Sequence, residues 1–326
     1  MKKSRFQNRV AESNLTLPVC ALLTTVLWCW WPNFMHDAFL IKHYELIIGW
    51  ALCALTTYVL LETNNRNVLI RIRTRMVACS WLALVACMGF LHADIRSLGC
   101  AFCLSASHYL LFSCYQQVDA VNNTFHSFFF LGLGSLAFPP VLVLAVCYYG
   151  YLAGYLRSLC WRSFWAGIVG LLIPYWVWAC WCLWGQDFSP FIQHFLPYFQ
   201  FVVSFVWTGY RDLSLDELAC WAFVTLLSMI GIIHYLRTSY NDKIRVRMIF
   251  NVLICQALLI QVAMVFFPIY FRPLVALYVV SSAPLVAHYF SLTTSKYTNA
   301  FFCLCLVMMV AYCLWSTVNG QQLNMN

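Results

Sequence analysis

The chain repeats one pattern from end to end, in which a stretch of roughly 20 apolar residues is followed by a short polar connection. Lipid offers no hydrogen-bond partner to the backbone, so a segment that crosses a bilayer must satisfy its own peptide groups as a helix. The pattern therefore predicts an all-α, polytopic membrane protein with about ten transmembrane helices. The clearest apolar stretches lie near residues 15–31, 40–61, 76–92, 97–114, 163–184, 217–236, 248–268, 273–290 and 299–316.

Composition excludes the other classes of protein. Apolar residues make up 63% of the chain and charged residues 9%, whereas a soluble domain is about 45–50% apolar and about 25% charged. So few charges cannot cover the surface of a water-soluble fold of this size. A soluble enzyme, a disordered chain and a typical nucleic-acid binder are therefore excluded. The net charge of +8 is attributed to basic blocks between spans, and no nucleic-acid partner is expected.

The ends of the chain define the expected domain organisation. Residues 1–14 form a predicted cytoplasmic N-terminal tail, residues 15–318 a single polytopic transmembrane domain, and residues 319–326 a C-terminal tail. No small-residue cleavage site follows the first apolar run, which ends at Trp31 and Pro32. We therefore expect an uncleaved first span rather than a signal peptide.

Lysine and arginine residues predict the orientation. One basic block follows the second apolar stretch, and another follows the stretch that starts near Glu217. The positive-inside rule places both blocks and the N-terminus in the cytoplasm, and the C-terminal tail then faces outward. The blocks consist of Arg66, Arg71, Arg73 and Arg75, and of Arg237, Lys243, Arg245 and Arg247.

Two stretches leave the number of crossings open. Residues 127–154 are apolar but are interrupted by Pro139 and Pro140. A hairpin of two short helices is favoured, because it keeps the arginines at 157 and 162 in the cytoplasm. The stretch 191–207 then lies along the outer interface. In the alternative, 127–154 is one long kinked span and 191–207 crosses the membrane.

The two basic blocks also indicate a parallel internal repeat. The segment from Arg71 to Met76 reads like the segment from Lys243 to Met248, at an offset of 172 residues. The same offset places Glu45 on Glu217, and each of these residues begins an inward apolar span. Duplication and convergence both explain this likeness, because arginine-flanked apolar helices resemble one another.

Metal and cofactor sites are not indicated by the sequence. No two histidines stand three or four residues apart, the spacing that places two ligands on one helix face. The cysteines lie mostly within apolar runs and are interpreted as small apolar side chains. We therefore expect no metal and no cofactor. A proton-coupled carrier would need a polar cavity near the midplane, for which His108 and His288 are the candidate residues.

Two sets of residues are candidates for a functional site. One is the basic set Arg71, Arg73, Arg75, Lys243, Arg245 and Arg247. These residues are interpreted either as topological anchors alone or as a site for lipid phosphate groups. The other is Asp37, which lies in the first outward loop. It is either a helix cap or the general base of a transferase that uses a lipid-linked donor.

Three motifs resemble those of an uncharacterised family of bacterial multi-pass inner-membrane proteins, sometimes labelled carotene oxygenases. The motifs lie in residues 130–140, 162–175 and 242–247, in the same order as in the family. The resemblance implies a helical architecture and an envelope location. The scattered histidines do not fit the iron site of an oxygenase. The glycine-rich span and the proline-broken hairpin are also similar to glycosyltransferases that use polyprenyl-phosphate sugars, although the long acidic first loop of those enzymes is missing.

Together these features predict an integral protein of the bacterial inner membrane. The predicted role is a non-catalytic scaffold, lipid-binding or transport component in envelope biogenesis, with membrane lipids as partners. The alternative is a multi-pass glycosyltransferase with a polyprenyl-phosphate ligand, in which Asp37 is the base and Arg157 or Arg162 lies near the phosphate.

Overall fold

A computed structural model describes residues 5–30, 41–117, 119–203, 210 and 213–323 of the chain. All regular secondary structure in these residues is helical, so the predicted all-α class is confirmed. Within these residues, seven helical segments are long and apolar enough to cross a membrane, and the pair α1 and α2, bent by 95°, adds an eighth if it is counted as one span. The seven are 44–67, 95–113, 161–184, 215–241, 244–266, 268–292 and 296–313.

The helices form two compact units that alternate along the sequence. Unit 1 comprises residues 1–95, 213–242 and 278–326, and unit 2 comprises residues 96–212 and 243–277. The elements in chain order are α1 (Phe6–Glu12), α2 (Thr16–Trp30), α3 (Ile41–Asn67), α4 (Met76–Cys87), α5 (Gly89–His92), α6 (Ile95–Ser113), α7 (Val121–Ala137), η2 (Pro139–Val141), α8 (Leu142–Gly154), α9 (Trp161–Trp184), α10 (Ser189–Val203), α11 (Leu215–Thr238), η4 (Ser239–Asn241), α12 (Ile244–Phe266), η5 (Pro268–Tyr270), α13 (Phe271–Leu292) and α14 (Lys296–Leu323).

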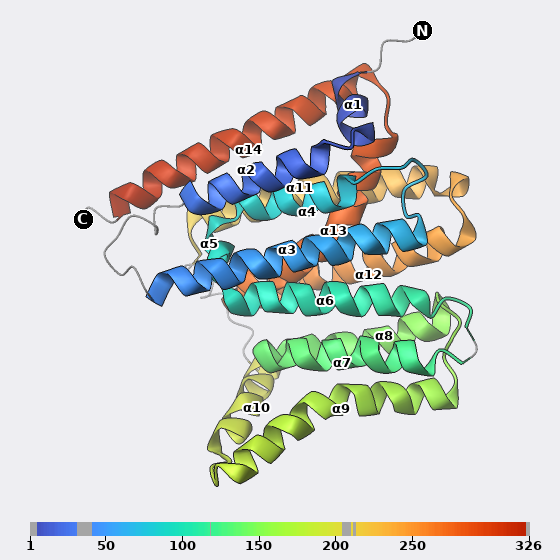
Figure 1. The fold of residues 1–326 in the computed structure, drawn as a ribbon, viewed down its shortest axis with the longest axis vertical. Coiled ribbons are helices and arrows are strands. Elements are labelled where there is room, and N and C mark those ends of the chain that lie inside the picture. The colour runs from blue at the N-terminus through green and yellow to red at the C-terminus, as the bar shows by residue number, and fades with distance from the viewer. Residues whose placement is uncertain (1–4, 31–40, 118, 204–209, 211–212, 324–326) are drawn as a thin grey trace. The chain divides into compact units, whose positions relative to one another are not determined.

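Helix α4 forms the core of unit 1. Every residue of α4 except Ala83 is buried, and α2, α3 and α14 pack against it (Figure 1). The fully buried indole of Trp81 donates a hydrogen bond to the Cys53 carbonyl oxygen of α3, at 3.4 Å. The helix stops at Met88, whose φ of −94° and ψ of 67° leave the helical region. The predicted span 76–92 is thus divided, and its 12-residue first part is about 18 Å long.

The N-terminal helix and several arginines gather at one end of unit 1. Gln7 of α1 donates from Nε2 to the Phe290 carbonyl oxygen at 2.6 Å, and from its backbone nitrogen to Asn299 Oδ1 at 2.9 Å. Thr74 Oγ1 donates to the Ala11 carbonyl oxygen at 2.6 Å. The N-terminal segment and the first arginine block therefore lie at the same end, as the predicted sidedness requires. We call this end the basic end of unit 1; its basic residues include Arg5, Arg9, Arg66, Arg71, Arg73, Arg75, Arg237 and Lys296.

In unit 2, residues 127–154 form the predicted hairpin. The chain leaves α7 at Phe138 in an extended conformation and turns through the short helix η2. The Phe128 ring then lies 4.6 Å from the Tyr149 ring, on opposite sides of the turn. The Gln116 backbone nitrogen donates to the Leu156 carbonyl oxygen at 2.9 Å, which joins the two open ends. The hairpin is confirmed, and the alternative of one long kinked helix is wrong.

Glycines bring α7 and α9 into backbone contact. A Cβ atom added to Gly132 would lie 2.6 Å from the Leu171 carbonyl oxygen, and one added to Gly170 would overlap the Phe125 carbonyl oxygen. The two glycines thus lie in reciprocal positions, one on each helix. This is the close approach that small residues permit between membrane helices.

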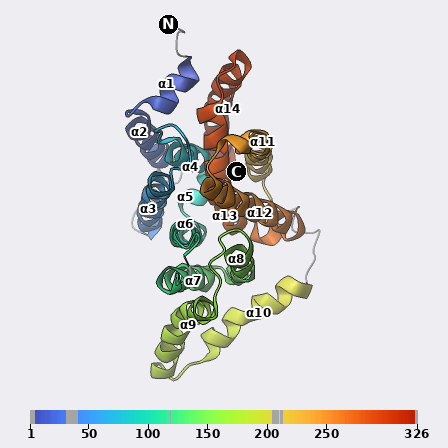
Figure 2. The same cartoon turned by 90° about the vertical axis from the view of Figure 1, so that its right-hand side faces the viewer.

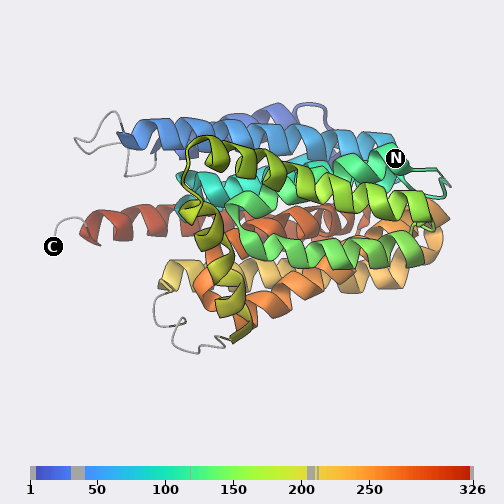
Figure 3. The ribbon, with the colours of Figure 1, turned by 90° about the horizontal axis from the view of Figure 1, so that it is seen from below.

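Helix α10 follows α9 after a short turn and runs in a different direction from it (Figure 3), in contact with the C-terminal half of α9. Its contacts are aromatic: Phe191 lies 5.2 Å from Trp178, and Phe195 lies 5.5 Å from Tyr175. Asp187 accepts hydrogen bonds from the backbone and hydroxyl of Ser189, which lower the pKa of this exposed carboxyl. The described part of α10 has 15 residues, and the interfacial position of the stretch stays a prediction. Residues 204–207 of the predicted stretch lie outside the described part.

Candidate functional site

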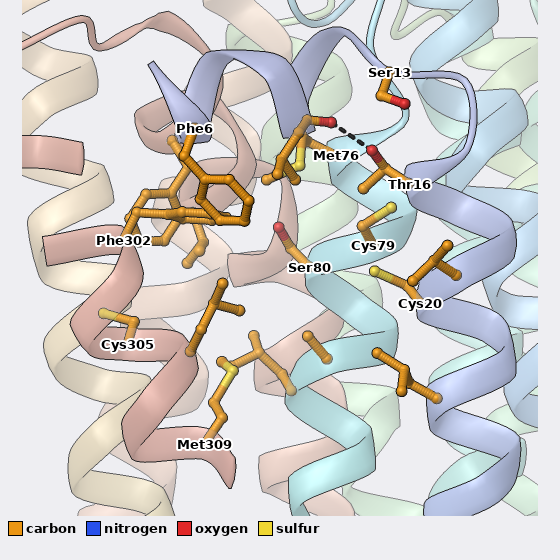
Figure 4. A pocket seen from close by; sticks show the side chains of 18 of the residues that line it. Phe6, Ser13, Thr16, Cys20, Met76, Cys79, Ser80, Phe302, Cys305 and Met309 are labelled. Atoms are coloured by element: carbon orange, nitrogen blue, oxygen red, sulfur yellow. Dashed lines mark hydrogen bonds between the residues drawn. The ribbon is translucent and has the colours of Figure 1, made fainter. Parts of the chain in front are cut away.

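An apolar groove of about 630 Å³ runs along the surface of unit 1. Helices α2 and α14 form its walls, α4 forms its floor, and α1 closes one end (Figure 4). In Figure 2, α2 and α4 are seen nearly end-on, and α14 runs at an incline beside them. Its volume lies in the range of sites that hold one small ligand. The side chains that define it include Val19, Cys20 and Leu23 of α2, Met76, Cys79, Ser80 and Ala83 of α4, and Phe302, Cys305, Leu306 and Met309 of α14.

The charged side chain and most of the hydroxyl groups of the groove lie at its α1 end, and Ser80 lies on its floor. Arg9, Ser13 and Thr16 line the groove there. Arg75 lies close by, because its Nη1 donates to the Asn14 carbonyl oxygen at 3.1 Å. The other walls are mostly hydrocarbon or sulfur. The groove therefore has one cationic, hydrogen-bonding end and an apolar remainder.

The length of the groove along α4 corresponds to the thickness of the hydrocarbon layer of one leaflet. Its floor extends from Met76 to Leu84, a rise of about 12 Å along α4. Half the hydrocarbon core of a bilayer is about 15 Å. The α2 wall is open to the surroundings, since Leu15 is 70% exposed and Leu23 is 55% exposed. A chain molecule in the surrounding leaflet can therefore enter from the side.

A buried ion cluster lies elsewhere at the basic end of unit 1. The Asp242 carboxylate, with a side chain only 1% exposed, lies 2.9 Å from Arg71 Nε and 3.3 Å from His288 Nε2. Arg71 reaches it from the connection between α3 and α4, and its own side chain is 42% exposed. His288 of α13 is fully buried. The carboxylate thus links three separate segments of unit 1.

Aromatic side chains of α11 surround this cluster. The His234 ring lies 5.7 Å from the His288 ring, and the Tyr235 ring lies 5.1 Å from it. Arg71 and His288 are separate candidates in the sequence, and no local pattern connects either of them with Asp242. The scarcity of acidic residues was the only available signal, because charge burial in a membrane protein indicates a paired or functional group.

The six candidate basic residues do not form one patch within a single unit. Arg71, Arg73 and Arg75 belong to unit 1, whereas the set 243–247 belongs to unit 2. In unit 2, Arg245 Nη2 donates to the Phe112 carbonyl oxygen at 3.4 Å, and its guanidinium lies 5.9 Å from the centre of the Tyr115 ring. Lys243 is exposed, and Arg247 is half-buried.

The histidines proposed for a carrier lie in packed surroundings. His108 of α6 is stacked on Phe112, and its Nε2 lies 2.9 Å from Gln256 Oε1 of α12. Both partners are buried. Such a pair holds membrane helices together with a contribution of about 0.6 kcal/mol. Neither His108 nor His288 lines the groove of unit 1.

The remaining predictions concern Asp37, metals and the exposed arginines. Asp37 lies outside the described residues. Arg157 and Arg162 are both exposed, at the end of the hairpin and at the start of α9. Within the described ranges, no group of three or more His, Cys, Asp or Glu side chains is placed to hold a metal ion. The structure therefore gives the groove and the ion cluster as its two candidate sites.

The functional assignment depends on the geometry of the groove and the ion cluster, because comparison with known proteins gives no match. No known protein family, no curated protein and no solved structure matches the chain.

Proposed function

We propose that this protein is a non-catalytic, lipid-binding component of the bacterial inner membrane that acts in envelope biogenesis. The observation that carries the proposal is the groove of unit 1, which is apolar along one leaflet depth and cationic at one end. An anionic phospholipid has the complementary shape and charge. Its acyl chain would lie against α4, between α2 and α14. Its phosphate would lie near Arg9 and Arg75, because guanidinium groups offer planar donors to phosphate oxygens.

The proposed orientation follows from the same end of the unit. With α1 and the first arginine block in the cytoplasm, the groove faces the inner leaflet, whose anionic lipids attract basic side chains. In this arrangement the seven long segments, the α1–α2 pair and the shorter helices α4, α7 and α8 give eleven crossings, one more than the roughly ten that apolar length predicts. The proposed parallel repeat pairs α3 with α11, since an offset of 172 residues carries Ile41–Asn67 onto 213–239, close to Leu215–Thr238. The resemblance to the bacterial inner-membrane family supports this location.

Filling the groove tests the proposal. Ala83 lines the groove and is the one residue of α4 that is not buried, so Ala83→Trp places an indole in the ligand space. Binding of phosphatidylglycerol, measured by native mass spectrometry of the purified full-length protein, is expected to fall by at least tenfold, or about 1.4 kcal/mol. The matched control is Ala153→Trp on the exposed face of α8, which should leave binding unchanged.

The charge of the groove is tested with a second substitution. Arg9→Ala is expected to weaken phosphatidylglycerol binding about fivefold, because one arginine near an anionic headgroup contributes about 1 kcal/mol. Binding of zwitterionic phosphatidylethanolamine should change less. Equal phosphatidylglycerol binding by the parent protein, Ala83→Trp and Arg9→Ala would contradict the proposal.

The transferase alternative predicts a different ligand. Selective binding of a polyprenyl phosphate over phosphatidylglycerol, together with loss of function in Asp37→Asn at normal protein levels, would favour it. We expect Asp37→Asn to retain function, because the proposal assigns the phosphate to Arg9 and Arg75 rather than to a catalytic carboxylate.

A further inference from the structure

A pair of thiols lies just beyond the apolar end of the groove in unit 1. Cys87 is the last residue of α4, and its Sγ lies 3.8 Å from Sγ of Cys313 in α14. Each cysteine follows a lining residue by four positions, Ala83 on the floor and Met309 on the wall. Residues four apart lie on the same helix face. The pair therefore continues the groove surface at the end opposite Arg9.

The two sulfur atoms are close enough to be joined by small movements. A disulfide needs a sulfur–sulfur distance of about 2.05 Å, so the separation must decrease by less than about 2 Å. Both cysteines are free and buried. Rotation about the two side chains can supply part of this movement, and α14 lies at the surface of unit 1, where it can supply the rest.

Helix α14 is the wall that such a bond would fix. Much of its surface is exposed, including Leu304, Val307 and Val310. Among the described residues, two hydrogen bonds besides the thiol contact join it to other helices of unit 1: the Gln7 backbone nitrogen donates to Asn299 Oδ1 near its start, and the Tyr312 hydroxyl donates to the Asp216 carbonyl oxygen at 3.0 Å. Between membrane helices the hydrophobic effect gives little attraction, because lipid tails are as apolar as leucine. Lipid can therefore replace the contacts between α14 and α4.

We propose that Cys87 and Cys313 are a redox modification site, at which a disulfide locks the α14 wall of the groove to its α4 floor. The reduced protein exchanges bound lipid, and the oxidised protein retains it. The lipid effect rests on the proposed function, whereas formation of the disulfide does not.

A small hydroperoxide is the chemical class of oxidant that fits this buried pair. The Cys313 thiolate attacks the peroxide, the O–O bond breaks, and a sulfenic acid and an alkoxide or hydroxide form. The Cys87 thiolate then attacks the sulfenic sulfur, the S–S bond forms, and hydroxide leaves. The protons of the two thiols neutralise the released bases. The pair is oxidised by two electrons, and one peroxide is reduced to water and an alcohol, or to water alone.

The test uses the full-length protein in phosphatidylglycerol nanodiscs. After treatment with hydrogen peroxide, free thiols are alkylated and the protein is digested without reduction. Mass spectrometry is expected to identify a peptide that joins Cys87 to Cys313. Exchange of labelled phosphatidylglycerol is expected to slow by at least tenfold and to recover on reduction. Cys313→Ser should abolish both effects, and the matched variant Cys303→Ser on the same helix should retain them.

Two outcomes would overturn the inference. One is complete alkylation of Cys87 and Cys313 in peroxide-treated folded protein. The other is a disulfide that leaves the exchange rate unchanged. If phosphatidylglycerol does not bind the reduced protein at all, the proposed function is contradicted, and the peptide that joins the two cysteines still supports the modification site.

Discussion

Replacing Asp242 by alanine is expected to lower the free energy of unfolding by about 3 kcal/mol. The substitution removes the carboxylate between Arg71 and His288 and leaves the buried imidazole without this partner. Removing one member of a buried ion pair costs about 3–5 kcal/mol. Arg71 is partly exposed, so water recovers some of the loss and the lower end of that range applies. Thermal unfolding in detergent, followed by near-ultraviolet circular dichroism, measures the effect.

The matched control for this prediction is Asp119→Ala. Asp119 is exposed in the connection before α7, so its removal should change stability by less than about 0.5 kcal/mol. Asp242→Asn keeps the shape of the side chain but loses its charge, and its effect should lie between the two. Equal unfolding temperatures for Asp242→Ala and Asp119→Ala would show that the ion cluster does not stabilise unit 1.

Gly170→Ala is expected to give the second largest loss of stability, about 1–3 kcal/mol. The new methyl group would overlap the Phe125 carbonyl oxygen, which is a backbone atom and cannot rotate away. Helix α9 must then move from α7, and the reciprocal contact of Gly132 with Leu171 opens at the same time. Unfolding in detergent and the yield of folded protein after size-exclusion chromatography measure the change.

Gly150→Ala is the control for this packing prediction. Gly150 lies inside α8, and an added Cβ meets no atom within 4 Å. The substitution should be neutral or should stabilise the helix by up to about 1 kcal/mol, since alanine is the better helix former. A loss as large as that of Gly170→Ala would show that glycine flexibility, rather than close packing, is what α9 requires.

Local sequence patterns predicted the all-α class and the hairpin of unit 2, whereas the count of about ten spans and the parallel repeat stay predictions. Apolar length predicted the helices, and the two prolines at 139 and 140 predicted the hairpin that the Phe128 and Tyr149 rings confirm. The break after Cys87 was not predicted, because residues 76–92 are continuously apolar. The break is possible because Met88 is fully buried, and irregular backbone is tolerated where protein surrounds it.

The candidate sites were harder to predict than the helices. The groove uses side chains of α1, α2, α4 and α14, and nothing in one local stretch indicates that the first and last helices of the chain meet. Arg71 was proposed as a lipid ligand from its place in a basic block, and pairing with Asp242 depends on a contact across 171 positions of sequence. Charge patterns predict which end of a helix is polar, whereas partners depend on tertiary contacts.

The discontinuous make-up of unit 1 has a consequence for how the protein is made. Helix α4 is too short to cross a bilayer alone, and one of its neighbours, α14, begins only at Lys296. During translation, α4 therefore leaves the ribosome about 200 residues before α14. All of unit 2 is synthesised in that interval. At the slow end of a translation rate of about 5–20 residues per second, the interval lasts tens of seconds. Until α14 is inserted, the face of α4 that packs against α14 must contact the insertion machinery or lipid instead. Premature termination before α14 should therefore produce a chain that quality-control proteases degrade.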